Sequence, residues 1–206
     1  MTQELLLVVD MQNDFMPKGA LAVPEGDAIV PLVNRLAARF PHVVLTQDWH
    51  PKGHFSFAAS HPGRRPFETI AAPYGPQVLW PDHCVQGTPG AAFHPDLAIP
   101  HAELVIRKGY NAGVDSYSGF READGRPTGL AGYLRERRVT AVVVAGLALD
   151  FCVAWSTRDA AAAGFVVTVV EDACRAIDTG GSLAAARADM AAAGVKVVRS
   201  EAFFGK

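Results

Sequence analysis

The sequence predicts a doubly wound α/β protein, with a mainly parallel six-stranded sheet and helices on both faces. Short aliphatic runs without strict alternation recur along the chain, which is typical of parallel strands buried on both faces. Helical patterns separate these runs, as in repeated strand–helix units. At 206 residues and 50% hydrophobic content, the chain is long enough to bury one substantial core. We therefore expect a single domain over residues 1–206, arranged as three layers.

Six segments are expected to form strands, and each is a continuous β-branched or aliphatic run. They are Leu5–Asp10, Val43–Asp48, Glu103–Lys108, Ala141–Leu147, Val166–Glu171 and Val195–Arg199. Four segments between them have helical patterns: Ala28–Arg39, Leu130–Arg137, Cys152–Ala163 and Leu183–Ala193. The last two are rich in Ala and are followed by Gly164 and Gly194, and Gly is common just past a helix C-terminus.

One segment, from about residue 49 to residue 100, breaks the alternation of strand and helix. It holds nine of the fourteen prolines together with many aromatic side chains. The aromatic content argues against disorder, so we expect an ordered loop excursion that covers the edge where the strands end.

Composition and charge exclude several classes of function. The formal net charge is −2 and no run of Lys and Arg could follow a phosphate backbone, so no nucleic-acid partner is expected. The apolar runs are too short for a membrane-spanning helix, and no targeting segment is recognisable. Three widely spaced cysteines, Cys84, Cys152 and Cys174, indicate reduced thiols in a cytoplasmic protein. We expect Cys174 to be an inert packed thiol.

Three apolar runs end on residues that can carry chemistry: Asp10, Lys108 and Cys152. Because the carboxyl ends of parallel strands converge on one crevice, these side chains are expected to meet there. Asp10 could accept a thiol proton and later pass it to a leaving amine, while Lys108 could hold Asp10 and stabilise negative charge. The alternative is a structural Asp–Lys ion pair at the edge of the sheet.

Cys152 lies where a helix is expected to begin. The positive end of the helix dipole is expected to lower the pKa of its thiol, and unpaired N–H groups at that end can hold an oxyanion. Nucleophilic catalysis by cysteine is therefore the favoured interpretation. The alternative is that Asp150 caps the helix and that Cys152 packs beneath it.

A second cluster has the composition of a metal site. All seven histidines lie within residues 42–101. Asp48 and His50 are separated by one residue, so in an extended chain both can face one point. A third ligand could come from His54 or His83, and two His with one carboxylate would suit Zn²⁺, Fe²⁺ or Mn²⁺. The alternative is ordinary hydrogen bonding within the loop.

These residues lie within motifs that resemble one known family. The motifs are VVDMQNDF, TQDWHP, WPDHCVQGT, KGYNAGVDSYSGF and GLALDFCVAWSTRDA. Together they resemble the nicotinamidases among the isochorismatase-like cysteine hydrolases, and the resemblance covers nearly the whole chain. It implies hydrolysis of nicotinamide to nicotinate and ammonia through a thioester, in NAD salvage, with pyrazinamide as a further substrate.

The resemblance also implies the residues of the site. The catalytic triad would be Asp10, Lys108 and Cys152. The oxyanion hole would be the backbone N–H groups of Ala148 and Cys152, with a cis peptide bond between Leu147 and Ala148. One divalent ion (Zn, Fe or Mn) would be held by Asp48, His50 and His83, with His54 as an additional or substitute ligand. The pyridine ring would be bound by Phe15, Leu21, Trp80 and Phe151.

Two positions depart from the family pattern. Leu149 stands where Thr is common, and Phe151 stands where Tyr or His is common. The first change removes a polar contact near the nucleophile, so it bears on the rate more than on the reaction type. The second makes the rim of the pocket more apolar.

Two other functions remain open at this point. The first is another amidohydrolase of the same superfamily, acting on a carbamoyl or ureido substrate. The second is a non-catalytic metal- or ligand-binding protein on the same scaffold. The sequence is compatible with a monomer or a homo-oligomer.

Overall fold

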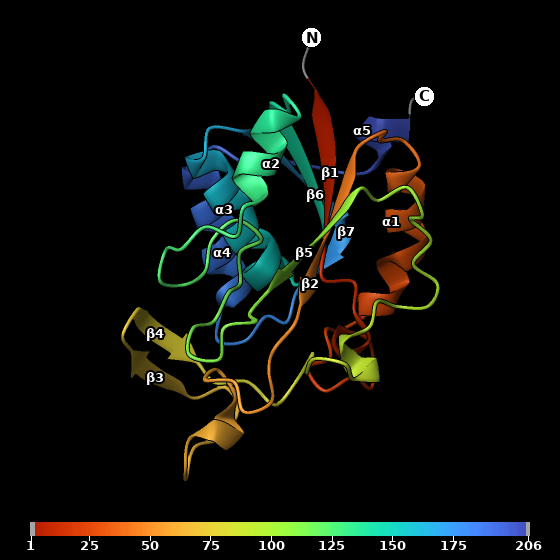
Figure 1. The fold of residues 1–206 in the computed structure, drawn as a ribbon. Coiled ribbons are helices and arrows are strands. Elements are labelled where there is room, and N and C mark those ends of the chain that lie inside the picture. Colours follow the sequence, from red (N-terminus) through yellow and green to blue (C-terminus); the bar gives the residue numbers. More distant parts are fainter. Residues whose placement is uncertain (1–2, 205–206) are drawn as a thin grey trace.

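The computed structural model describes residues 3–204 and contains one six-stranded sheet whose neighbouring strands are all parallel (Figure 1). Its strands are β1 (Glu4–Val9), β2 (Val43–Asp48), β5 (Leu104–Lys108), β6 (Ala141–Leu147), β7 (Val166–Arg175) and β8 (Lys196–Val198). The six predicted strands are confirmed. The largest differences are at β7, which continues four residues past Glu171, and at β8, which is shorter than Val195–Arg199.

Helices cover both faces of the sheet. They are α1 (Val30–Ala37), α2 (Leu130–Glu136), α3 (Ala154–Ala162), α4 (Ser182–Ala192) and α5 (Glu201–Phe204). Helices α2, α3 and α4 lie on one face, while α1 and α5 lie on the other (Figure 1). Strand β1 serves both layers: Leu6 and Val8 pack into the apolar cluster of α1, and Leu5 and Leu7 into that of α2, α3 and α4. The predicted three-layer α/β arrangement is therefore confirmed.

The order of the strands places a topological switch between β1 and β6. In space the order is β5-β2-β1-β6-β7-β8, so the chain builds outward from β1 to β5 and then returns to β6 beside β1. Open α/β sheets bind ligands in the crevice beyond the carboxyl ends of the strands at such a point.

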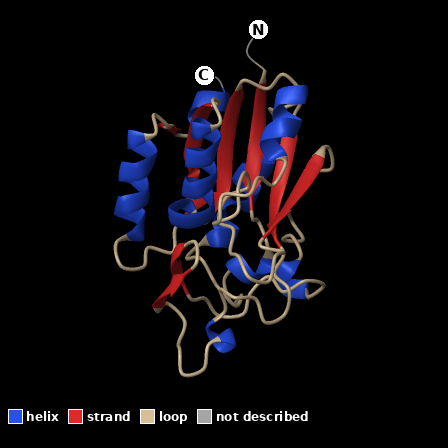
Figure 2. Cartoon of the chain, turned by 60° about the vertical axis from the view of Figure 1, so that its left-hand side comes forward, coloured by secondary structure: helices blue, strands red, loops and turns tan. Residues whose placement is uncertain are grey.

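The excursion between β2 and β5 contains a hairpin that the sequence analysis did not predict. Strands β3 (Thr69–Ala72) and β4 (Gly75–Val78) pair antiparallel and lie apart from the main sheet (Figure 2). Each strand has only four residues, and Pro76 interrupts the pattern of the second, which is why neither was recognisable. Isolated bridges connect the excursion internally at Phe57–Trp80 and His50–Val85.

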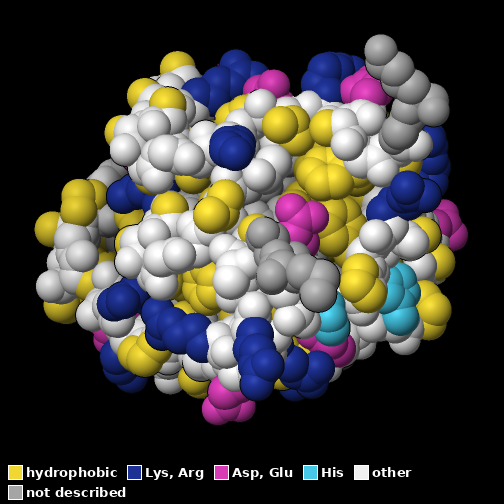
Figure 3. Space-filling model, turned by 90° about the horizontal axis from the view of Figure 1, so that it is seen from above, with side chains coloured by type: hydrophobic (Ala, Val, Ile, Leu, Met, Phe, Trp, Pro, Cys, Tyr) yellow, Lys and Arg dark blue, Asp and Glu magenta, His cyan; other side chains and the backbone are white. Residues whose placement is uncertain are grey.

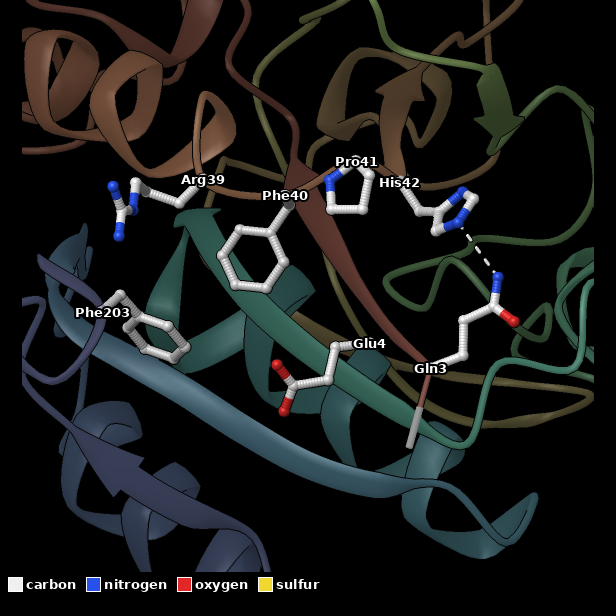
Figure 4. A pocket seen from close by; sticks show the side chains of 7 residues that line it. All are labelled: Gln3, Glu4, Arg39, Phe40, Pro41, His42 and Phe203. Atoms are coloured by element: carbon white, nitrogen blue, oxygen red, sulfur yellow. Dashed lines mark hydrogen bonds between the residues drawn. The ribbon is translucent and has the colours of Figure 1, made fainter. Parts of the chain in front are cut away.

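The end of the sheet where β1 and β2 begin lies on the side of the molecule that holds the chain ends (Figure 1). Seen from the side of the chain ends, Lys and Arg side chains lie around the rim of the molecule, interspersed with other types (Figure 3). A cavity of about 380 Å³ opens there beside the starts of β1 and β2, and its lining, within residues 3–204, includes no cysteine. Gln3 and His42 are hydrogen-bonded at its wall, 3.0 Å apart (Figure 4). No helix among the described residues is long and apolar enough to cross a membrane.

Candidate active site

The strand ends bring Asp10, Lys108 and Cys152 together in one buried crevice. Lys108 Nζ lies 2.8 Å from Asp10 Oδ2 and 3.3 Å from Cys152 Sγ. A carboxylate oxygen of Asp10 and the Cys152 sulfur lie within 4.8 Å of each other. The three residues are 0%, 1% and 5% exposed, so an acid, a cation and a thiol share one space from which bulk water is excluded.

The backbone around Asp10 fixes its carboxylate in place. Asp10 leaves β1 with a φ of 47°, in the left-handed region that few non-Gly residues adopt. Thr46 stabilises this conformation, because its hydroxyl donates to Asp10 Oδ1 at 2.6 Å and accepts the Asp10 N–H at 3.2 Å. Gly146 lets β6 pass close by, since a Cβ there would lie 2.1 Å from the carbonyl oxygen of Val9.

Cys152 lies in a π-helical turn rather than at the start of an α-helix. The turn spans Leu149–Val153, and α3 begins only at Ala154. The carbonyl of Ala148 accepts the N–H groups of both Phe151 and Val153 at 3.1 Å. The Leu147–Ala148 peptide bond is cis, as the resemblance implies. Turns of the π type are frequent at functional sites.

Burial determines the acid–base properties of the three residues. Burial raises the pKa of the Cys152 thiol well above its usual value, and the charge of Lys108 offsets this only in part. The prediction of a lowered thiol pKa is therefore wrong, because desolvation of the thiolate outweighs the helix dipole. Burial also raises the pKa of Asp10, which makes its carboxylate a stronger base. Burial acts to lower the pKa of Lys108, but the charges of Asp10 and Asp48 raise it well above its usual value.

Asp48, His50 and His83 form a second group beside these residues. His50 Nε2 and His83 Nε2 lie 3.5 Å and 3.6 Å from Asp48 Oδ2. Tetrahedral ligands about 2.1 Å from an ion are about 3.4 Å apart, so this spacing fits one shared ion. Each imidazole donates its Nδ1–H to a backbone carbonyl, His50 to Gly109 at 2.9 Å and His83 to Pro81 at 2.8 Å. Such a contact orients a ligating imidazole and fixes its tautomer.

His54 falls in a different candidate metal-ligand group, together with His50 and Asp115. Its Nδ1 lies 2.8 Å from the hydroxyl of Ser56, and its Nε2 donates to the carbonyl of Asn111 at 2.9 Å. Its ring does approach His50, with the two ring centroids 4.3 Å apart. The structure therefore brings the expected ligands Asp48, His50 and His83 together, while both nitrogens of His54 have protein partners.

Lys108 joins the two groups through Asp48. Its Nζ donates to Asp48 Oδ1 at 2.6 Å, while Asp48 Oδ2 faces the two imidazoles. Burial acts to raise the pKa of Asp48, but the charges of Lys108 and His50 lower it well below its usual value. Asp48 is therefore a carboxylate, with one oxygen toward the ammonium group and the other toward the candidate metal site.

Gln12 is a contributor to the site that the sequence analysis did not single out. Its Oε1 accepts the N–H of Asp48 at 2.7 Å, and its Nε2 donates to the carbonyl of Asp48 at 2.8 Å and to that of Ala91 at 2.9 Å. The amide thus pairs with the Asp48 backbone as a neighbouring strand would. The available signal was a polar amide within a motif that follows a buried strand directly.

An apolar pocket lies next to both groups. The four residues expected to bind a ring all line it: Phe15, Leu21, Trp80 and Phe151. Three lining residues were not predicted: Asp115, Tyr117 and Ile177. The rings of Trp80 and Phe151 meet edge to face, with centroids 4.9 Å apart. The hydroxyl of Tyr117 accepts the indole N–H of Trp80 at 2.8 Å, which fixes this wall.

Comparison with known proteins defines the class to which the fold and site belong. The isochorismatase domain family matches residues 4–202, which is nearly the whole chain. This protein belongs to the isochorismatase family.

Within that family, the chain is similar to nicotinamidases. A nicotinamidase of Acinetobacter baylyi is 55% identical over 196 residues, which cover 95% of this chain and 92% of that protein. The solved structure of an Acinetobacter baumanii nicotinamidase and pyrazinamidase superposes with a TM-score of 0.97 at 56% identity and covers 98% of both chains. A pyrazinamidase of Pyrococcus horikoshii, solved in complex with zinc, gives a TM-score of 0.79 at 37% identity, over 96% of this chain and 99% of that one.

Proposed function

We propose that this protein is an amidohydrolase that converts nicotinamide and water to nicotinate and ammonia. The observation that carries the proposal is the position of Lys108, whose Nζ lies within 3.3 Å of Asp10, Asp48 and the Cys152 sulfur. Lys108 thereby connects the residues proposed for amide hydrolysis to the residues expected to bind the pyridine ring. The 55% identity to a nicotinamidase supports the same substrate.

The first half of the reaction forms a thioester. Asp10 takes the proton of the Cys152 thiol, and the sulfur attacks the carboxamide carbon. Negative charge then develops on the carboxamide oxygen, where the backbone N–H groups of Ala148 and Cys152 stabilise it. Asp10 returns the proton to the nitrogen as the carbon–nitrogen bond breaks, and ammonia leaves. Burial raises the pKa of the Asp10 carboxyl, which makes its carboxylate a better acceptor of the thiol proton, and the ammonium group of Lys108, 3.3 Å from the sulfur, stabilises the thiolate that forms.

The second half of the reaction hydrolyses the thioester. Asp10, again a carboxylate, takes a proton from water as its oxygen attacks the acyl carbon. The carbon–sulfur bond breaks, the proton on Asp10 returns to the Cys152 sulfur, and nicotinic acid leaves and releases its remaining proton to water as nicotinate. Throughout, Lys108 keeps its charge and balances whichever group carries the negative charge.

Recognition of the ring depends on the second group of residues. A divalent ion held by Asp48, His50 and His83 would supply a Lewis-acid contact for the lone pair of the pyridine nitrogen. Phe15, Trp80 and other walls of the pocket exclude water and orient the ring. The main contribution of ring binding to the rate is to orient the carboxamide over Cys152, since positioning of the reacting groups lowers the activation barrier substantially.

Several finer features belong to the same proposal. Pyrazinamide, which has a second ring nitrogen and the same carboxamide, is expected to be a substrate, and the Acinetobacter baumanii similarity supports this. The ion is Zn, Fe or Mn, and the zinc complex of the Pyrococcus horikoshii relative supports the first. The three cysteines are free, which supports a cytoplasmic role in NAD salvage.

An ammonia-release assay tests the proposal. The protein is assayed on nicotinamide as purified, after chelation, and after separate additions of Zn²⁺, Fe²⁺ and Mn²⁺. We expect turnover that is lost on chelation and restored by at least one ion. Turnover that is indifferent to metal removal would overturn the assignment of Asp48, His50 and His83 as ligands.

A second class of substrate distinguishes nicotinamide hydrolysis from the alternative reaction of the same superfamily, hydrolysis of carbamoyl compounds. N-carbamoyl amino acids carry an amide-type nitrogen but no pyridine nitrogen to face a metal. We expect kcat/KM to be far higher for nicotinamide than for these compounds. A preference for the carbamoyl substrates would assign the chain to another reaction of the family.

A further inference from the structure

The candidate ring pocket is almost filled by its own walls. Its free space is about 20 Å³, which is room for about one water molecule. A pyridine carboxamide has nine non-hydrogen atoms, so its ring is expected to be in close contact with the residues that line the pocket. The positions of these residues will therefore determine which ring substituents fit.

Ile177 forms one of these walls and is carried by a short loop. The loop, residues 176–181, joins β7 to α4. Asp178, Gly180 and Gly181 in this loop have φ values of 51°, 60° and 83°, so the chain makes a tight irregular turn. The Ile177 side chain packs against the same apolar cluster that contains Phe15.

Asp150 connects this loop to the nucleophile turn. Its Oδ1 accepts the N–H of Ile177 at 3.0 Å, and its Oδ2 accepts the N–H of Asp178 at 2.8 Å and the hydroxyl of Ser182 at 2.5 Å. Asp150 therefore does not cap the helix that follows Cys152, which was the alternative considered from the sequence. Its carboxylate is 5% exposed and stands outside the proposed chemistry.

We propose that Asp150 is a positioning residue that sets Ile177 against the substrate ring and so controls ring selectivity. The inference rests on the proposed function. It follows from two facts: the carboxylate binds the peptide of Ile177 itself, and it belongs to the same five-residue turn as Cys152. One buried group thereby connects the turn that carries Cys152 to the pocket wall that carries Ile177.

Steady-state kinetics on nicotinamide and on a ring-methylated nicotinamide test the inference. Asp150→Asn keeps the shape of the side chain but removes one acceptor. We expect KM for nicotinamide to rise about tenfold, the change that corresponds to losing one charge-assisted hydrogen bond, with a smaller change in kcat. The discrimination against the methylated substrate should fall. Asp159→Asn, a change of the same kind in α3 and outside the pocket, should leave both values unchanged.

A double-mutant cycle decides whether Asp150 acts through Ile177. In an Ile177→Ala background, Asp150→Asn should change KM by less than about twofold, because the wall that Asp150 positions is already gone. Equal changes of KM in both backgrounds would overturn the inference while leaving the proposed function in place. Absence of nicotinamide hydrolysis by the unaltered protein would instead remove the proposed function.

A milder variant covers the case in which Asp150→Asn does not fold. Ser182→Ala removes one donor to Asp150 and leaves the two peptide contacts. We expect a smaller increase in KM, about threefold, that again disappears in the Ile177→Ala background. An unchanged KM and unchanged discrimination in Ser182→Ala, together with an additive cycle, would contradict the proposed role.

Discussion

Replacing Lys108 with Met is expected to destabilise the protein far more than the loss of a surface lysine would. Lys108 Nζ contacts Asp10 at 2.8 Å and Asp48 at 2.6 Å, and all three side chains are at most 5% exposed. Among residues 3–204, Asp10 Oδ2 has no hydrogen-bond partner besides this ion pair. Met has a similar length, so packing is largely kept while the charge is lost. The result is two buried carboxylates without their cation.

Removing one partner of a buried ion pair costs about 3–5 kcal/mol, and here two carboxylates depend on one cation. For a chain of this length, that loss corresponds to a decrease in Tm of roughly 6–20 °C. The matched control is Lys52→Met, at an exposed lysine, which should change stability by less than about 0.5 kcal/mol.

The pH dependence of this loss follows from the signs of the pKa shifts. The lowered pKa of Asp48 stabilises the native protein above the unfolded pKa of about 3.9, and this contribution disappears as pH falls. Without Lys108, burial dominates and both carboxylates become costly to ionise. The difference between variant and parent should therefore be largest near pH 7 and should shrink toward pH 4. Urea unfolding of the metal-free proteins across this range measures this difference in stability. A difference below about 1 kcal/mol at pH 7 would show that Lys108 does not stabilise the two buried carboxylates.

Three further predictions concern neighbouring residues. Asp10 must be unprotonated to accept the thiol proton, so kcat/KM at saturating metal should fall with decreasing pH through its raised pKa; an acidic limb at or below about 3.9 would contradict this. Gln12→Ala should weaken metal binding about 10–100-fold, measured by competition with a chromogenic chelator, because the backbone of Asp48 loses its partner. Tyr117→Phe leaves the buried indole N–H of Trp80 unpaired, so we expect a loss of about 1–3 kcal/mol in urea unfolding and a higher KM.

The strand ends were predictable because each is a polar residue after an uninterrupted apolar run. Asp10 and Lys108 could be placed in one crevice from this pattern alone. The contact of Lys108 with Asp48 could not, because it requires β2 to pair with β5 in a register that sets Asp48 opposite Lys108. No local sequence pattern predicts which strands are neighbours in the sheet. Cys174 is packed as predicted, with its pKa raised by burial to about 12.

The ring pocket was predictable only through the family resemblance. Phe15, Trp80 and Phe151 come from distant parts of the chain and have no common local signal. Ile177 was missed because it enters the pocket through a loop whose position depends on Asp150. The predicted direction of the pKa shift of the Cys152 thiol was wrong for a related reason. It depends on complete burial by the excursion and the neighbouring strands, which a helix boundary does not reveal.

Ammonia release by Cys152→Ala shows directly whether this thiol is the nucleophile. Nicotinamide is supplied to the metal-loaded variant, and metal content is measured on the same sample. We expect a loss of turnover of at least about 10⁴-fold with metal content unchanged, while Cys174→Ala retains both turnover and metal. Ammonia release near the level of the unaltered protein from Cys152→Ala would contradict covalent catalysis by this thiol.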